Sequence, residues 1–576
     1  LELIDTDTTS PGLIPILTEF FEKRVGKRVV RALDTPGFIA NRYGMWSMYH
    51  AVHIAEKLQL RIEDVDTITG AFLGRPRSGS FRLNDIVGID VMESIAQNQL
   101  ARCENDPFIG TLTAPRSIKH LIEQKHLGNK SGKGYYERVG KEFFALDFQT
   151  LAYRPIVDDV LKTVAAYEKL PIGERIREAL NTKDEVGEFL RLYLVPALRY
   201  ADYLKSEVCY SIHDFDNVMK WGFGWTHGPF ELIDAIGPEL ILEKTHNFYE
   251  KGTQLGVHGH GYVAVPNAPE FRALTDYPVC HKHGELVFRD LGDEVQSIEY
   301  STKMGSVSPT VVRDFLSFLD SNPSCKYVLA SSAKAFSVGF DLRFFQDCIE
   351  REDWMSIIKA ISELQQLGER LEKFPIVSAV HGYCLGGGFE IAMSCPRLVA
   401  LSDAQIGLPE AKVGLIPGGR GAINVRLRNQ LWIPALRNAI IDIAEGTIWS
   451  NAPEALAHGL LRQTDEICFH PDRLIQTAKE MVLELDVDAY KPFRWEPVGQ
   501  QIVGMVDQDI QSRVTDGRFT AYDEHIAQHL KALACKSKSY DDALSTEQER
   551  FLELCKRPET KARIDHMLET SKPLRN

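Results

Sequence analysis

The run of three glycines at 386–388 constrains the fold more than any other feature, because it lies between a short apolar segment and an amphipathic one. The apolar segment 376–380 predicts a buried strand, and the glycines then open a helix that carries Glu390. Glycine lets a ligand approach the backbone closely, and the first turn of a helix offers free N–H groups and the positive end of a dipole. We therefore expect a strand–turn–helix unit whose amides can hold a developing oxyanion.

Two further glycine turns follow predicted strands. KAFSVGFDL at 334–342 comes after the apolar run 327–330, and GLPEAKVGLIPGG at 407–419 places Glu410 between a proline and another glycine turn. Three such turns after three strands predict one shared pocket, in which an N–H from each of two turns would form a two-donor site. Two carboxylates beside it could move protons and position water. Taken singly, Glu390 could instead be a surface acid of its helix, and Glu410 a buried capping group.

The composition limits the class of protein. The 576 residues include 44% hydrophobic and 9% aromatic side chains, enough for several domains with sizeable cores. The formal net charge of −14 argues against nucleic acid or an anionic membrane as the main partner. The ten cysteines form no CxxC pair, no apolar run is long enough to span a bilayer, and no strong zinc pattern occurs. We therefore expect a cytoplasmic protein without a metal, a membrane span or a disulfide framework.

The pattern along the chain predicts a multidomain α/β protein. The segment 221–239 repeats the order of glycine, aromatic, Asp and Ile-Gly found in 74–92, so we expect two copies of a helical domain. From about residue 285 onward, apolar strands alternate with helices. The expected segments are 1–34, the end of a larger α/β domain; 35–149 and 150–280, the two helical copies; 285–480, a second α/β part; and 481–576, a helical C-terminal region.

Several motifs resemble known families. KAFSVGFDL, SAVHGYCLGGGFEIAMSC and AQIGLPEAKVGLIPGG, in this order, resemble the crotonase (enoyl-CoA hydratase/isomerase) family. Residues 1–280 resemble the 3-hydroxyacyl-CoA dehydrogenase family through VVRALDTPGFIANR, FLGRPRSGSFRLNDIVGID, KSGKGYY and GWTHGPFELIDAIG. This order resembles one type of bifunctional β-oxidation protein. The resemblance implies an incomplete Rossmann NAD-binding domain at 1–34, two helical dehydrogenase C-terminal-type domains, and a crotonase-like ββα superhelix with a helical C-terminus.

For the crotonase part, the resemblance implies an oxyanion site formed by the amides of Phe340 and Gly387, with Glu390 and Glu410 holding and activating water. The implied reaction is the hydration of trans-2-enoyl-CoA to (3S)-3-hydroxyacyl-CoA, which needs no cofactor. The presence of both glutamates favours a hydratase over an isomerase or a thioesterase. The implied substrate-binding residues are Ala335, Ser337, Gly339, Asp341, Leu342, Gly386 and Pro409.

For the dehydrogenase part, Asn41 corresponds to a substrate-orienting asparagine, and Glu2 to the glutamate that pairs with a catalytic histidine. That histidine is expected before Leu1, and no G-x-G-x-x-G turn for NAD follows a strand in the chain. The resemblance therefore implies truncation at the N-terminus. The full-length protein would oxidise 3-hydroxyacyl-CoA with NAD, whereas this chain would not. The second helical copy has no recognisable counterpart of Asn41 and is expected to be structural.

Two residues depart from the family pattern. Phe340 stands where a small residue is common, and Arg420 stands between two glycines. A phenyl ring would reshape the acyl pocket, and a guanidinium near the water would shift the pKa values of the glutamates. Three functions therefore stay open: a hydratase, an isomerase or acyl-CoA hydrolase of the same fold, and an inactive CoA-binding or assembly module. The implied partners are acyl-CoA thioesters, with a thiolase and further copies of the chain as candidates.

Overall fold

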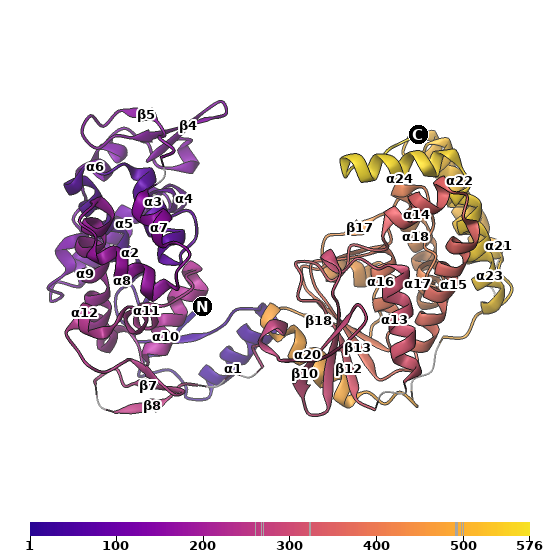
Figure 1. Ribbon diagram of the computed structural model, residues 1–576, viewed down its shortest axis with the longest axis horizontal. Coiled ribbons are helices and arrows are strands. Elements are labelled where there is room, and N and C mark those ends of the chain that lie inside the picture. Colours follow the sequence, from indigo (N-terminus) through magenta and orange to yellow (C-terminus); the bar gives the residue numbers. More distant parts are fainter. Residues whose placement is uncertain are drawn as a thin grey trace. The chain divides into compact units, whose positions relative to one another are not determined.

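The computed structural model forms two compact units, which Figure 1 shows with their helices and strands labelled. Unit 1 comprises residues 1–22 and 27–267, and unit 2 comprises residues 23–26 and 268–576. The structure describes residues 1–159, 161–259, 261–266, 268, 270–321, 324–489, 493–496, 498 and 500–576.

Unit 1 begins with a strand–helix–strand segment, within the range 1–34 that is expected to end an α/β domain. Strand β1 (Glu2–Ile4) pairs in parallel with β2 (Val30–Ala32), and helix α1 (Leu13–Phe20) connects them. Both strands are short, but β2 buries Val30 and Ala32 against the helical core of the unit. The two strands therefore pack on the helices that follow, whereas α1 has no buried residue.

The rest of unit 1 is helical, with two small antiparallel sheets. The longest helices, α2 (Ala40–Leu58) and α9 (Glu185–Val208), pack against each other, and each carries three buried aromatic side chains. The other helices are α3 (Ile62–Thr69), α4 (Phe81–Val87), α5 (Ile89–Arg102), α6 (Arg116–Glu123), α7 (Lys162–Tyr167), α8 (Ile172–Asn181), α10 (Ile212–Asn217), α11 (Pro229–Ile236) and α12 (Pro238–Leu242). The sheets are β3 (Tyr136–Val139), β4 (Glu142–Leu146) and β5 (Tyr153–Pro155), and β6 (Tyr249–Glu250), β7 (Thr253–Leu255) and β8 (Tyr262–Ala264).

The internal repeat of the sequence corresponds to one hydrogen-bond arrangement that is built twice in unit 1. In each copy, a buried aspartate, Asp66 or Asp216, accepts two amide N–H groups from the start of a helix and one tyrosine hydroxyl. The donors to Asp66 are the amides of Phe81 and Arg82 and the hydroxyl of Tyr136; those to Asp216 are the amides of Phe230 and Glu231 and the hydroxyl of Tyr249. Each aspartate therefore fixes the start of α4 or α11 and ties it to a small sheet.

Unit 2 is built on a seven-stranded sheet in the order β18-β15-β13-β12-β11-β10-β9. The strands from β11 to β18 pair in parallel, and β10 and β9 add an antiparallel edge. The apolar runs that predict strands form β10 (Leu286–Gly292), β11 (Val295–Tyr300), β12 (Lys326–Leu329), β13 (Ile376–Val380) and β15 (Arg397–Leu401), beside β9 (Val279–His283) and β18 (Glu466–Cys468). Both faces of β13 are buried, as expected for a central parallel strand.

A second, smaller layer places the glycine turns side by side. Strand β14 (Tyr383–Leu385) pairs in parallel with β16 (Gln405–Gly407), and β17 (Ile448–Trp449) completes this sheet. Ser337 forms a parallel bridge with Cys384, which in turn lies opposite Ile406. Because these three segments run in the same direction, the residues that follow them leave the layer at one edge.

Helices surround the sheets of unit 2. They include α13 (Pro309–Asp320), α14 (Leu342–Glu350), α15 (Trp354–Leu371), α16 (Gly386–Ser394), α17 (Gly421–Asn429), α18 (Ile433–Ala444), α19 (Ala452–Ala457) and α20 (Leu474–Glu484). The C-terminal helices are α21 (Gln500–Thr515), α22 (Ala521–Lys536), α23 (Tyr540–Cys555) and α24 (Pro558–Thr570). They pack on α14, α15, α17 and α18, and Figure 1 shows them in yellow along this side of the unit. Among the described residues, no helix is long and apolar enough to cross a membrane.

Candidate active site

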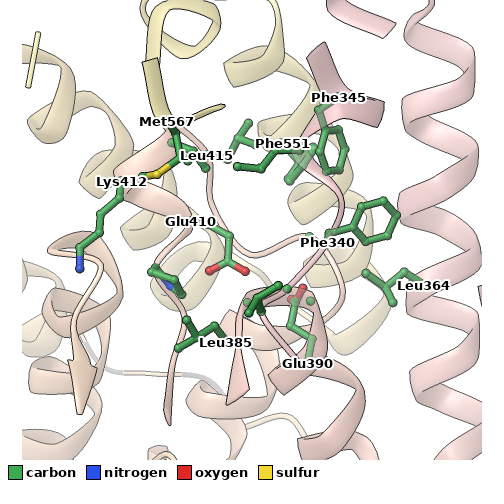
Figure 2. Close-up of a pocket in the computed structure, with 18 of the residues that line it drawn as sticks. Phe340, Phe345, Leu364, Leu385, Glu390, Glu410, Lys412, Leu415, Phe551 and Met567 are labelled. Atoms are coloured by element: carbon green, nitrogen blue, oxygen red, sulfur yellow. The ribbon is translucent and has the colours of Figure 1, made fainter. Parts of the chain in front are cut away.

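Three turns of unit 2 meet around a cavity of about 290 Å³. Phe340, Gly387 and Pro409 each stand three positions after a residue of the paired layer, so the parallel register brings them to one edge. All three line the cavity, together with Glu390 and Glu410. Figure 2 shows the two carboxylates turned toward the same central space between the turns. The predicted convergence of the glycine turns is therefore present in the structure.

Two backbone amides of these turns are suited to receive an oxyanion. Val307 bonds to the backbone on either side of Phe340, to the Gly339 carbonyl and the Asp341 amide, so the Phe340 amide faces away from Val307. A methyl group added to Gly387 would lie 3.5 Å from this Phe340 nitrogen, which places the two turns in contact. In the part of the chain that the structure describes, neither the Phe340 nor the Gly387 amide donates to a protein acceptor. Both donors are therefore available to a ligand oxygen.

Gly386 allows the helix to start against a carboxylate. Its φ is +49°, in the left-handed region that favours glycine, and a Cβ there would lie 2.8 Å from Oε1 of Glu410. Any other side chain would have to displace this carboxylate from the cavity. The glycine run is therefore required by close approach as well as by the turn geometry.

Glu390 is held rigidly by a turn on the far side of the cavity. Its Oε1 accepts the amide N–H groups of Gly419 and Gly421 at 2.8 and 2.7 Å, and the residue is only 3% exposed. Burial raises the pKa of Glu390 to about 7, although the donors from Gly421 and Gly419 and the charge of Arg420 oppose this rise. Glu390 therefore changes its charge near neutral pH.

Glu410 has a different environment. It begins the short 3-10 turn Glu410–Val413, and its Oε2 has no hydrogen-bond partner within the described residues. Protein surrounds the carboxyl group, yet the residue keeps some accessible surface because it lines the cavity. Burial, and then the charge of Glu390, raise the pKa of Glu410 well above its ordinary range. Both effects favour the protonated form of Glu410, whose carboxyl group is turned toward the central space of the cavity in Figure 2.

One wall of the cavity is apolar and comes partly from the C-terminal helices. Phe551 of α23 packs on Phe345 of α14 with ring centroids 5.4 Å apart, while Met567 of α24 and Lys412 lie on the other side of the cavity, as Figure 2 shows. The remaining apolar lining residues are Val338, Phe340, Leu342, Ile361, Leu364, Leu385, Val413, Leu415 and Ile448. The sequence reasoning missed Phe551, Met567 and Lys412. The only available signal was the helical spacing of apolar residues after position 540, which does not say what the helix covers.

The predicted substrate-binding residues separate into two groups. Gly339, Leu342, Gly386 and Pro409 line the cavity, as do the predicted oxyanion residues. Ala335, Ser337 and Asp341 do not. The Ser337 hydroxyl donates to the Gly305 carbonyl and accepts from the Gly339 amide, Asp341 accepts the Arg343 amide at the start of α14, and Ala335 is fully buried. These three residues therefore support the turn on the side away from the cavity.

Arg420 also differs from the expectation that its side chain lies near the water site. The residue is 1% exposed with φ +75°, and its guanidinium forms an ion pair with Glu372 outside the cavity lining. Only its backbone takes part in the turn that holds Glu390. Its charge still lowers the pKa of Glu390, but as a smaller effect than burial and the amide donors.

The predicted dehydrogenase residues lie together at one helix end in unit 1. Oε1 of Glu2 accepts the amides of Ile39 and Ala40 at 2.7 and 3.1 Å, which caps the start of α2, and Asn41 is the exposed next residue. Burial raises the pKa of Glu2. The sequence has no G-x-G-x-x-G turn after a strand to receive a dinucleotide pyrophosphate, so the residues present do not fit NAD.

One group of side chains has a composition that metals use. His525 and His529 on α22 and Glu553 on α23 bring their ligand atoms within 4.8 Å of one another. The two Nε2 atoms are 3.1 Å apart, which is the distance of a hydrogen bond between the rings. We therefore assign no metal to this group.

Two family models match the chain. Residues 302–465 match the enoyl-CoA hydratase/isomerase model, and residues 37–138 match the 3-hydroxyacyl-CoA dehydrogenase C-terminal domain. A Bacillus subtilis protein named probable 3-hydroxyacyl-CoA dehydrogenase is 29% identical over 100% of this chain and 78% of its own length. A Rickettsia prowazekii protein named putative fatty acid oxidation complex trifunctional enzyme is 25% identical over 97% of this chain and 77% of its own length.

A further relative matches a smaller share of the chain. The Bacillus subtilis protein named probable enoyl-CoA hydratase is 41% identical over 96 residues, which are 16% of this chain and 36% of that protein. The two family models cover separate stretches, one in each unit. The chain is thus a fusion of a 3-hydroxyacyl-CoA dehydrogenase C-terminal domain with an enoyl-CoA hydratase/isomerase domain.

Proposed function

We propose that unit 2 hydrates trans-2-enoyl-CoA to (3S)-3-hydroxyacyl-CoA in fatty acid β-oxidation. The observation that carries this proposal is the single cavity shared by two free turn amides and two buried carboxyl groups. Amide donors can stabilise a thioester enolate, and paired carboxyls can add the elements of water. The relatives named for fatty acid oxidation and for enoyl-CoA hydratase support the same assignment.

The thioester carbonyl oxygen would lie between the amides of Phe340 and Gly387. Negative charge develops on this oxygen when a nucleophile adds to C3 of the enoyl group, and preorganised donors stabilise that charge more than they stabilise the substrate. Loss of one such donor typically costs ~3–4 kcal/mol in the barrier. The apolar wall formed by residues such as Phe345 and Phe551 would receive the acyl chain.

The two carboxyl groups would divide the proton transfers. Glu390, anchored by two amides and readily ionised, would take a proton from water while its oxygen bonds to C3. Glu410, whose raised pKa favours the protonated form, would give its proton to C2. The C2–C3 double bond becomes a single bond, one C–O bond and one C–H bond form, and the pair as a whole ends with the same number of protons. Because both carboxyl groups face one space, both new bonds form on the same face of the substrate.

For unit 1, we propose that Asn41 orients a 3-hydroxyacyl-CoA and that the first helical copy carries this role, while the second copy supports it. In such a dehydrogenase, NAD would accept the hydride. Because the sequence has no G-x-G-x-x-G turn after a strand for the NAD phosphates, the role proposed for unit 1 does not include NAD. Three further points remain predictions: the domain limits expected from the sequence, a thiolase partner, and self-association of the chain.

The first test is direct. Purified protein should remove the enoyl thioester absorbance of crotonyl-CoA, and chiral analysis should identify the (3S)-hydroxy product. Interconversion of 3-enoyl and 2-enoyl substrates without hydration would identify an isomerase instead, and release of free CoA would identify a hydrolase. Tight acyl-CoA binding without turnover would identify a binding module and reject the proposal.

A further inference from the structure

We propose that Glu547, on helix α23, is a positioning residue of the hydration site that holds, from the opposite side, the turn to which Glu390 is bound. This inference rests on the proposed hydratase activity of unit 2. Glu547 is neither of the two predicted glutamates, and it does not line the cavity. It lies near the site because α23 packs on α15.

The contacts of Glu547 and Glu390 alternate along one turn. The amides of Gly419 and Gly421 donate to Glu390, whereas the amide between them, that of Arg420, donates to Oε2 of Glu547 at 2.9 Å. Three consecutive N–H groups therefore bind two carboxyl groups. Successive amides in such a turn form a concave anion-binding surface, and here both sides of it are used.

The conformation of the turn explains why a second carboxyl group is needed. Arg420 has φ +75°, an unfavourable value for a residue with a side chain. The Arg420 amide is buried with its residue, so without Glu547 it would be left without an acceptor. The flanking positions must be glycine, because a Cβ on Gly419 or Gly421 would lie 3.0 or 2.7 Å from the Glu390 carboxylate. Glu547 therefore stabilises a strained turn whose displacement would move Glu390.

Glu547 is itself fixed and fully buried. Its Oε2 also accepts Nε2 of Gln365 from α15 at 2.8 Å, and the residue has no accessible surface. Its Oε1 has no hydrogen-bond partner among the described residues, which leaves this oxygen for a proton. One helical turn further along α23, Phe551 lines the cavity, so the same helix face serves the acyl wall and the catalytic turn.

The charge of Glu547 is linked to the catalytic pair. Burial, and then the charge of Glu390, raise the pKa of Glu547 to about 8, against donation from Gln365 and the Arg420 amide and the Arg420 charge. At neutral pH Glu547 is therefore mostly neutral, which leaves Glu390 as the group that ionises first. When Glu547 ionises at higher pH, its charge raises the pKa of Glu410 and helps to keep that residue protonated.

The test uses three variants of the whole chain. In Glu547→Gln, the amide oxygen can replace Oε2 as acceptor while the ionisable proton is lost; in Glu547→Leu, both are lost. Glu549→Gln, on an exposed position of the same helix, is the matched control. Hydration of crotonyl-CoA is measured as kcat and KM across pH, and amide hydrogen exchange is measured for the segment 418–422.

Each variant has a distinct expected result. Glu547→Leu should lower kcat at least ~tenfold with KM within ~twofold, less than the ~100-fold that a 1 Å misplacement can cause. Its turn amides should exchange faster. Glu547→Gln should keep the slow exchange and most of kcat at neutral pH, but move the alkaline limb of the kcat/KM profile at least ~0.5 unit lower, because one nearby charge is gone. Glu549→Gln should match the unmodified protein throughout.

The outcomes separate this inference from the proposed function. A protein that never hydrates crotonyl-CoA would reject the hydratase, whereas hydrogen exchange would still report whether Glu547 holds the turn. If hydration is present and Glu547→Gln has an unchanged pH profile, the proposed link to the catalytic pair is wrong. Unchanged exchange in Glu547→Leu would show that Glu547 does not hold the turn. Should Glu547→Leu fail to fold, the pH profile of Glu547→Gln decides alone.

Discussion

Buried carboxyl groups occur in both units, but they have different surroundings. In unit 1, Asp66 and Asp216 are buried and each accepts three hydrogen bonds from its own fold. In unit 2, Glu410 is enclosed by protein and lines a cavity, yet its Oε2 has no hydrogen-bond partner among the described residues. Burial raises the pKa in both places, to about 7 for Asp66 and well above the ordinary range for Glu410.

This difference shows which observation points to chemistry. A raised pKa follows from removal of water alone, so it marks structural and catalytic carboxyl groups equally. An incompletely bonded carboxyl group beside two free amide donors is much more specific, because a fold gains nothing from leaving such groups without partners. The aspartates of unit 1 are therefore helix anchors, and the glutamates of unit 2 are the groups that we propose to be reactive.

The largest expected effect comes from changing the reactive pair. Glu390→Gln and Glu410→Gln should each lower the hydration of crotonyl-CoA by at least ~100-fold, because general acid–base catalysis contributes at least that much. Both amides are close to isosteric with the acids, so the melting temperature should change little. Steady-state kinetics and thermal unfolding measure the two effects.

Asp66→Asn in unit 1 is the matched control for these variants. It alters an equally buried carboxyl group that has no place in the proposed reaction, so hydration per folded molecule should stay unchanged. Near-normal hydration by both glutamine variants of unit 2 would instead remove the distinction between anchoring and reactive carboxyl groups.

A smaller loss is expected from Gly387→Ala. The added methyl group would lie 3.3 Å from Cβ and 3.5 Å from the amide nitrogen of Phe340, in the space that the thioester oxygen should occupy. Hydration should fall ~100-fold, near the low end for loss of one oxyanion donor. Gly504→Ala on α21, where a Cβ meets nothing within 4 Å, should leave the rate unchanged. An unaffected rate in Gly387→Ala would place the oxyanion elsewhere.

Asp66 should make the free energy of unfolding depend on pH. The folded-state pKa of Asp66 is raised to about 7, above its value in the unfolded chain. The folded form therefore holds a proton that the unfolded form has lost, so the free energy of unfolding decreases as pH rises from about 4 to about 7. One proton contributes a slope of about 1.4 kcal/mol per pH unit.

Denaturant unfolding of the chain at several pH values can isolate this contribution. The difference between the unmodified protein and Asp66→Asn should carry the slope, because asparagine does not titrate. Asp7→Asn, at an exposed position of the same unit, should show no such difference. An increase of the difference with pH, in place of the decrease, would mean that Asp66 stays ionised in the fold.

The sequence predicts the turns that form the cavity better than it predicts the C-terminal helices that cover them. The three glycine turns could be placed together because they follow strands of one parallel layer, a local pattern with a fixed geometric result. Glu547, Phe551 and Met567 could not be placed, because more than a hundred residues separate them from the turns and their helix pattern does not name a partner. Ser337 and Asp341 were carried over from a motif, but neighbouring residues of an extended turn point to opposite sides, and theirs face the protein.

The smallest expected effect concerns substrate choice at Phe340. Its amide is the proposed donor and does not depend on the side chain, whereas its ring lines the cavity 5.1 Å from the ring of Phe345. Phe340→Ala should therefore keep crotonyl-CoA hydration within ~threefold and raise kcat/KM for longer acyl chains relative to it by ~tenfold, a typical effect for one methylene in an apolar pocket. Competition between short and long enoyl-CoA substrates measures this ratio directly. If the ratio stays fixed while all rates fall together, the ring supports the donor amide, and the acyl chain must follow another part of the cavity.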